Sequence, residues 1–338
     1  MSKRSIEFPG TLPPTMGTIP TGKLRTIQEK QAEKFPPKQD SNINPLTAFF
    51  RKSKLFLTLP SRGKWYPTNS LALDSNGNLP IFAMNAEDDI KLRTGDFTLS
   101  GENVFEVIRS CVPGIKQPEN IPSIDLDAIL LAIRVASYGA VFDFTVSVPN
   151  TTLTRTLSVN AQKLLAPRNE IWDDDLSIED ETGQKLSIQV IPIPVRNLFQ
   201  TTKNIFELRK AINKSVDAEQ NITNEKGFNS TMSLLAAKPI ELICSSIQKL
   251  SLFDPNGNKL AELNAANPQD QPKIKQTIGN LDVAYFNAIK EHFEIQRKKF
   301  VFTSDEQTST PKEINAGAPE KWTTELTFIG SNFLPEQK

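Results

Sequence analysis

The chain has 338 residues, and its 39 lysine and arginine residues balance 39 aspartate and glutamate residues, which excludes a strong net field toward nucleic acid or membrane surfaces. Its two cysteines, Cys111 and Cys244, exclude a disulfide framework, and no apolar run approaches the roughly 20 residues that span a bilayer. We therefore expect a soluble protein, made in a reducing cytoplasm, that is long enough for one large core or two ordinary ones.

The first segment, residues 1–50, is predicted to be a disordered, proline-rich arm. It holds seven of the 24 prolines and shows no apolar periodicity. Such a segment can fold onto a partner protein when it binds. The ordered part of the chain is expected to begin near residue 51.

Turn chemistry predicts three β-hairpins. Asn76 and Gly77 supply the positive φ angles of a tight turn between two strands within residues 71–84. Similar turns are expected at 181–184 and at 255–258. The sequences that flank the three turns differ, so we attribute the likeness to common turn chemistry rather than to an internal repeat.

Helices are predicted from apolar residues at helical spacing, from capping residues and from acidic first turns. Asn85 and Ser100 are the expected caps of the first two helices, and Pro239 is expected to break or kink a later one. The predicted helices cover residues 85–93, 100–112, 123–139, 160–165, 197–220, 229–250 and 281–297.

Strands complete the prediction. Phe142 and Phe144 alternate with polar residues along a half-buried strand that turns back at 149–151, and further strands are expected near the C-terminus. The fold class is therefore α+β, with a small mixed front domain of hairpins and helices followed by a mainly helical back half. The predicted divisions are a disordered arm (1–50), an α+β core (51–192) and a mainly helical region with C-terminal strands (193–338).

Residues 57–67 read LTLPSRGKWYP, which is neither a clean strand nor a helix. A phosphate-binding P-loop needs two glycines, then lysine and serine or threonine, before a helix. Here Gly63 and Lys64 are followed by Trp65, and the upstream glycine is missing. The prolines and Gly63 predict an ordered turn, in which Trp65 and Tyr66 act as anchors. A partner-binding element is the alternative interpretation.

No catalytic or metal site is predicted. The acidic stretch 170–181 lacks the ligand register of a calcium-binding EF-hand. The single histidine, His292, lies beside an apolar helix stripe without a nucleophile motif, and Cys111 lies on the buried face of its helix. We therefore predict no enzymatic activity, no cofactor and no metal ion.

Several short motifs follow one another between residues 57 and 148. They are Leu59-Pro60-Ser61-Arg62-Gly63-Lys64 before an aromatic-Tyr-Pro sequence, Met84, Glu87-Asp88-Asp89, Ser110-Cys111-Val112, and Asp127 through Arg134 to Tyr138-Gly139. This series resembles the baseplate hub and hub assembly proteins of T-even-type contractile-tailed bacteriophages. Many members of that family resemble a metal-knuckle protein, with Cys-Pro-x-Cys after the strand. This chain has Val148-Pro149-Asn150-Thr151 there, which cannot bind zinc.

The resemblance implies a non-enzymatic baseplate hub component or hub assembly factor that acts by protein–protein binding during contractile tail assembly. It implies partners among other hub or tail proteins, and a location in the virion tail baseplate, in the host cytoplasm during assembly, or in both. A subunit retained in the particle and a chaperone that leaves it are both open. The alternative is a phage accessory protein that binds nucleic acid or a host factor.

The 57–67 stretch also contains the expected partner-contact residues, because aromatic and arginine side chains dominate interface energies. The predicted contact residues are Arg62, Lys64, Trp65 and Tyr66. In a competing interpretation, the two cations pair with Asp88 or Asp89 and hold the front domain together.

Overall fold

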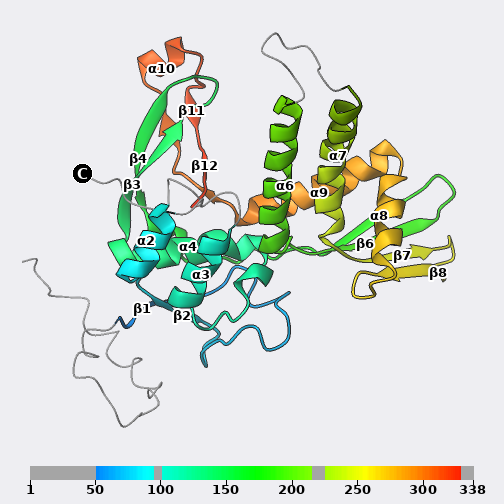
Figure 1. Cartoon of the computed structure of the whole chain (residues 1–338), viewed down its shortest axis with the longest axis horizontal. Coiled ribbons are helices and arrows are strands. Elements are labelled where there is room, and N and C mark those ends of the chain that lie inside the picture. The colour runs from blue at the N-terminus through cyan, green and yellow to red at the C-terminus, as the bar shows by residue number, and fades with distance from the viewer. Residues whose placement is uncertain (1–50, 95–100, 215–224, 329–338) are drawn as a thin grey trace, which may run out of the picture. The chain divides into compact units, whose positions relative to one another are not determined.

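The computed structural model describes residues 51–94, 101–214 and 225–328 (Figure 1). These residues belong to one compact unit that begins at Arg51. The arm predicted for residues 1–50 lies outside the described residues, as does the predicted cap Ser100. The unit contains both helices and strands, so the mixed α+β class is confirmed.

The first part of the unit surrounds one helix, α4, that is buried on nearly every side. Eleven of its 16 residues are buried, because its apolar side chains point in all directions rather than along one stripe. It stops at Gly139, whose φ of 100° lies outside the helical region. The elements up to this point are β1 (Ser53–Leu57), β2 (Leu79–Phe82), α2 (Ala86–Thr94), α3 (Glu102–Cys111), the 3-10 turn η3 (Pro118–Asn120) and α4 (Ser123–Tyr138).

The first predicted hairpin has its turn but not its strand partner. Gly77 adopts a φ of 79° in that turn, and β2 follows it. However, β2 pairs antiparallel with β1 rather than with the residues before the turn. Those residues bind elsewhere, since the N–H of Ala72 donates to the carbonyl of Gly114 at 2.8 Å. The prediction failed because turn chemistry fixes the turn and leaves the choice of strand partner to tertiary packing.

The predicted strand pair around residue 150 is present as a two-stranded ribbon of β3 (Val141–Ser147) and β4 (Thr154–Asn160). One face is buried against C-terminal residues, where the ring centroid of Phe328 lies 5.8 Å from those of Phe144 and Phe302. Figure 1 shows the C-terminal elements beside this ribbon. The remaining short elements are α5 (Ala161–Leu164), β9 (Phe302–Thr303), β10 (Gln307–Thr308), α10 (Pro311–Asn315), β11 (Lys321–Trp322) and β12 (Glu325–Leu326).

The largest sheet is four-stranded and antiparallel, with the order β5–β6–β7–β8. It contains two predicted hairpins, β5 (Asp175–Glu179) with β6 (Lys185–Val190), and β7 (Ile247–Phe253) with β8 (Lys259–Asn264). Because β6 pairs with β7, this one sheet holds strands from both sides of residue 192. The expected arrangement of a front domain and a mainly helical back half is therefore not confirmed.

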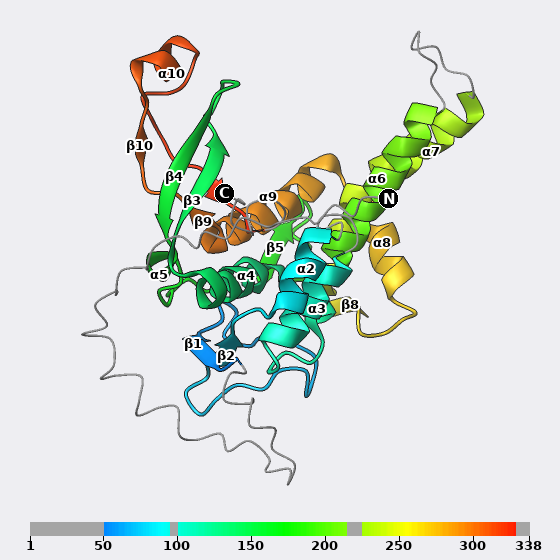
Figure 2. The same cartoon turned by 60° about the vertical axis from the view of Figure 1, so that its left-hand side comes forward.

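Four longer helices accompany this sheet: α6 (Val195–Lys214), α7 (Glu225–Cys244), α8 (Gln271–Gly279) and α9 (Val283–Phe300). In both views, α6 and α7 lie side by side as an antiparallel pair (Figures 1 and 2). The predicted helix 229–250 is too long, since residues 247–250 belong to β7, and Pro239 lies within α7. Helix α8 was not predicted, although Ile274 and Ile278 are buried at helical spacing.

A second core lies where this sheet meets α8 and α9. Ile188 of β6, Ile278 of α8 and Ile289 of α9 are almost fully buried in it. Trp172 joins them and donates its indole N–H to the carbonyl of Val190 at 2.8 Å. In the part of the chain that the structure describes, no helix has the length and apolarity needed to cross a membrane.

The C-terminal elements are tied back to the ribbon and to α4. The Arg155 Nε of β4 donates to the Glu313 carboxylate at 3.0 Å, and its guanidinium lies 5.4 Å from the ring centroid of Trp322. The backbone N–H of Phe328 donates to Asp127 of α4 at 3.2 Å. Burial raises the pKa of this carboxyl to about 6, against the hydrogen bond from Phe328. The end of the described chain therefore closes the first core, which is the apolar cluster around α4 and the β3–β4 ribbon.

Candidate protein-binding loop

Residues 59–67, which follow β1, form a tight loop that we call the 59–67 loop. Two backbone hydrogen bonds close successive turns within it. Arg62, Gly63 and Trp65 have φ angles of 54°, 79° and 65°, all in the left-handed region. That region costs a non-glycine residue on the order of 1 kcal/mol, so other interactions must hold Arg62 and Trp65 there.

A buried carboxylate on α4, Asp125, holds the loop. The Ser61 N–H donates to Oδ1 at 2.7 Å, and the Ser61 hydroxyl donates to Oδ2 at 2.5 Å. The Tyr66 hydroxyl donates to the same Oδ2 at 3.0 Å. Asp125 is 0% exposed, and this burial raises its pKa to about 6, although the hydrogen bonds from Ser61 and Tyr66 act in the opposite direction. One side chain thus fixes both ends of the turn.

The two aromatic residues of the loop pack inward against different cores. Tyr66 packs against the first core, and burial, followed by the charge of Asp125, raises its pKa well above the usual value. Trp65 packs against the second core, where its ring meets Trp172 edge-on at a centroid distance of 6.3 Å. Both are half-buried, as expected for anchors that stabilise the loop.

The two cations of the loop, Arg62 and Lys64, are exposed. The Lys64 ammonium lies 5.7 Å from the ring centroid of Trp65, which is its one close aromatic contact in the described structure. Neither cation forms an ion pair with another described residue. The loop therefore presents two positive charges from a backbone that is fixed on its inner side.

The competing interpretation, in which the loop cations pair with the acidic start of α2, is wrong. Asp88 pairs with Arg51, whose Nη1 lies 2.9 Å from Oδ2. Asp89 pairs with Arg93 at 2.8 Å and also accepts a hydrogen bond from the Tyr138 hydroxyl. Both carboxylates are satisfied by nearer donors, so they leave the loop cations available to solvent or to a partner.

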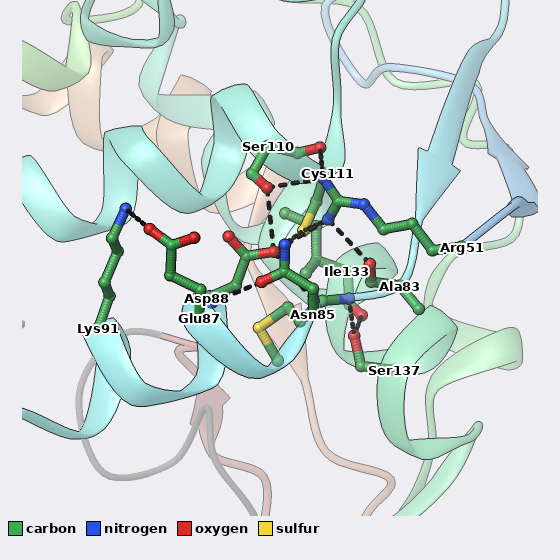
Figure 3. Close-up of polar contacts among 11 residues, drawn as sticks. Arg51, Ala83, Asn85, Glu87, Asp88, Lys91, Ser110, Cys111, Ile133 and Ser137 are labelled. Carbon is green, nitrogen blue, oxygen red and sulfur yellow. Dashed lines mark hydrogen bonds and ion pairs between the residues drawn. The ribbon is translucent and has the colours of Figure 1, made fainter. Parts of the chain in front are cut away.

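Arg51 is the centre of the polar cluster in Figure 3. Besides Asp88, its guanidinium donates to the carbonyl of Ala83 at 3.1 Å and to that of Ser110 at 2.6 Å. Asp88 is 4% exposed, so the Arg51 guanidinium is the cation that compensates its buried carboxylate. Asn85 caps α2 as predicted, because its side chain accepts from the Asp88 N–H at 2.8 Å and Asp88 accepts from the Asn85 N–H at 3.0 Å.

The other sequence candidates show no reactive geometry. Burial raises the pKa of Cys111 to about 12 and that of Cys244 to about 11, so both thiols remain protonated at neutral pH. The His292 imidazole lies 3.0 Å from the carbonyl oxygen of Asp173. Over residues 51–94, 101–214 and 225–328, no group of three or more histidine, cysteine or acidic side chains is placed to hold a metal ion.

Sequence reasoning missed Asp125, the residue that fixes the loop. An aspartate in the first turn of a helix, where negative charge is favoured, needs no distant partner to explain it. A signal was available, because Asp125 sits between Ile124 and Leu126 in a helix that is apolar on all sides. A carboxylate in such a position has to find donors from another segment.

Comparisons with known proteins do not assign a family. The chain matches no protein-family model, no curated protein and no solved structure. The resemblance to baseplate hub proteins therefore stays a prediction from the motifs between residues 57 and 148.

Proposed function

We propose that this protein is a non-enzymatic component or assembly factor of a contractile-tail baseplate hub, and that it binds another hub or tail protein through the 59–67 loop. One observation carries the binding proposal: a loop with two strained non-glycine residues is fixed to both cores while Arg62 and Lys64 are exposed. Strained backbone of this kind is concentrated at functional sites. A loop that is already ordered also loses little conformational entropy on binding.

The contact that we propose is electrostatic. Because Trp65 and Tyr66 pack inward, Arg62 and Lys64 are the loop residues that a partner would meet first, and they fit an acidic surface. Arginine can bind a carboxylate through two parallel hydrogen bonds, whereas lysine acts as a point charge. The two aromatic residues then serve the contact indirectly, by fixing the direction of both cations.

The hub assignment is tested first by quantitative mass spectrometry of purified phage particles and of lysate from the cells that produce them. A small fixed ratio of this chain to other baseplate proteins in the particle identifies a retained subunit. Abundance in lysate with absence from particles identifies an assembly chaperone. A chain found in neither baseplate nor assembly intermediates removes the hub assignment.

The loop is tested by placing a photoreactive amino acid at position 62 in the full chain and identifying the crosslinked protein. Binding of that protein is then compared for an Arg62→Ala, Lys64→Ala double variant and a matched Lys52→Ala, Lys54→Ala variant, whose lysines are also exposed. Two exposed charges contribute on the order of 1 kcal/mol together, so we expect about fivefold weaker binding for the loop variant alone. Equal binding by both variants contradicts the loop proposal, and retention on a DNA column that depends on Arg62 and Lys64 favours the nucleic-acid alternative.

A further inference from the structure

The four-stranded sheet has one face with two complete rows of apolar side chains. The register places Leu176, Ile188, Leu250 and Leu263 side by side in the first row. Ile178, Leu186, Leu252 and Ala261 form the second row in the same way. The rows lie two residues apart along each strand, so they share one face of the sheet.

The helices cover these two rows unequally. In the first row, Ile188 is 0% and Leu250 is 3% exposed, because both pack in the second core. In the second row, Ala261 is exposed and the other three side chains are only half-buried. A cavity of about 350 Å³ lies over this row, and Leu281 and Tyr285 line its helix side. We call this cavity the sheet groove.

The negative charge at the groove comes from its β5–β6 end. Of the two charged lining residues, Glu262 is paired with Lys249 and Lys259, whereas Asp180 forms no ion pair with another described residue. Asp180 accepts hydrogen bonds from the Thr182 hydroxyl and from backbone N–H groups of its own turn, which lower its pKa and keep it ionised. Glu181 of the same turn and Glu179 at the end of β5 add two carboxylates, against the cation Lys185 at the start of β6.

The chain itself carries a feature of the opposite kind on α6. Phe206 is 49% exposed, an unusual position for a large aromatic side chain. Lys203, Arg209 and Lys210 lie three residues before, three after and four after it, so they share its face of the helix. None of these three cations forms an ion pair with another described residue, and Glu207 is the one carboxylate on α6.

We propose that the sheet groove of one molecule binds α6 of a second copy of the chain, with Phe206 inserted over the second row and its flanking cations next to the acidic turn. The apolar lining accepts an aromatic side chain, and the Tyr285 ring beside it favours an edge-to-face contact. The opposite charges fix the direction in which α6 lies across the groove. This assembly is independent of the 59–67 loop and of the partner proposed for it.

Such a contact joins two different surfaces, so it is head-to-tail. Each molecule keeps a free Phe206 at one end and a free groove at the other after the first contact forms. The expected products are rings or longer assemblies rather than a closed two-fold dimer. This property separates the proposed contact from association through a single self-complementary patch.

The test measures the size of the full chain by sedimentation velocity over a concentration series. Phe206→Asp removes the anchor, and Ala261→Arg fills the groove with a side chain that repels the cations of α6. Ser177→Arg is the matched control for the groove, because Ser177 is exposed on β5 between Leu176 and Ile178 and therefore points to the opposite face of the sheet. Ile295→Asp, at a side chain 50% exposed on α9, is the control for the anchor. Circular dichroism confirms that each variant is folded.

We expect the wild type and both controls to associate, and Phe206→Asp or Ala261→Arg to weaken association by about 30-fold, as for loss of a central aromatic anchor. An equimolar mixture of these two variants should form a 1:1 dimer, because one supplies an intact groove and the other an intact anchor. A wild-type chain that stays monomeric overturns the proposal. So does a mixture that stays monomeric, or a control that weakens association as strongly as the matched variant.

Discussion

The substitution Asp125→Asn tests how the 59–67 loop is anchored. The folded protein raises the pKa of this carboxyl to about 6, whereas an aspartate has a usual value of 3.8. Because the folded-state pKa is raised, protonation of Asp125 favours the fold. This contribution is complete below about pH 4 and is lost as the pH rises through about 6. A difference of about two pH units corresponds to about 3 kcal/mol of unfolding free energy.

The difference in unfolding free energy between the variant and the wild type should therefore change with pH rather than stay constant. Asparagine cannot ionise, but its amide oxygen can still accept from the Ser61 N–H, and the hydroxyls of Ser61 and Tyr66 can turn to accept from its amide. We expect the wild-type free energy of unfolding, relative to that of the variant, to fall by about 2.4 kcal/mol between pH 4 and pH 7, because the unfolded carboxyl is already partly ionised at pH 4.

The assay is urea unfolding of both proteins at several pH values, followed by tryptophan fluorescence. Asp143→Asn, at an exposed position on β3, shows how far removal of any carboxylate alters the profile. The pKa of Asp127 is also raised to about 6, so this carboxyl makes the unfolding free energy fall with pH in the same direction. Asp127 is present in both proteins, so its contribution cancels in the comparison. A constant difference across this pH range would refute the argument, since it would mean that Asp125 has the same pKa in the folded and the unfolded chain.

Three further predictions follow from the packing. Gly101→Ala should lower the free energy of unfolding by about 2 kcal/mol or more, because a Cβ there would lie 2.4 Å from the Phe199 ring. Gly77→Ala has a similar positive φ but lies in open space, so it should lower it by about 1 kcal/mol. Thermal unfolding of the two variants measures the difference. Arg51→Ala should destabilise the protein by about 2 kcal/mol in urea because it strips Asp88 of its cation, while Lys52→Ala should have little effect. Cys111, with its pKa raised to about 12, should react with a thiol reagent at pH 8 only after urea is added, and rapid labelling of the native chain would contradict its burial.

Local patterns predicted those elements whose residues decide their own conformation. The alternation of Phe142 and Phe144 gave the β3–β4 ribbon, and the turns at 181–184 and 255–258 formed their hairpins. The cap at Asn85 is also a local feature, because its partner lies three residues away. In each of these cases the interactions that stabilise the element lie within a few residues of it.

Long-range partners were not available from such patterns. The N–H of Ser61 donates to Asp125, which lies 64 residues further along the sequence, and the residues around neither of them indicate this partner. The pairing of β6 with β7 could not be predicted for the same reason, since a hairpin pattern specifies only the pairing of its own two strands. The expected boundary near residue 192 followed from composition, whereas sheet pairing is set by which apolar faces can be buried together.

The anchored loop and the sheet groove should also respond differently to salt, because one offers charge and the other adds apolar area. Arg62 and Lys64 are solvent-exposed, so an interaction that depends on them weakens as ionic strength shortens the Debye length to below about 10 Å. The α6 contact has the same electrostatic part through Lys203, but burial of the Phe206 ring is not screened by ions. High salt should then release a partner held by the loop while leaving part of the self-association. Complete loss of both at the same salt concentration would mean that Phe206 is not buried in the contact.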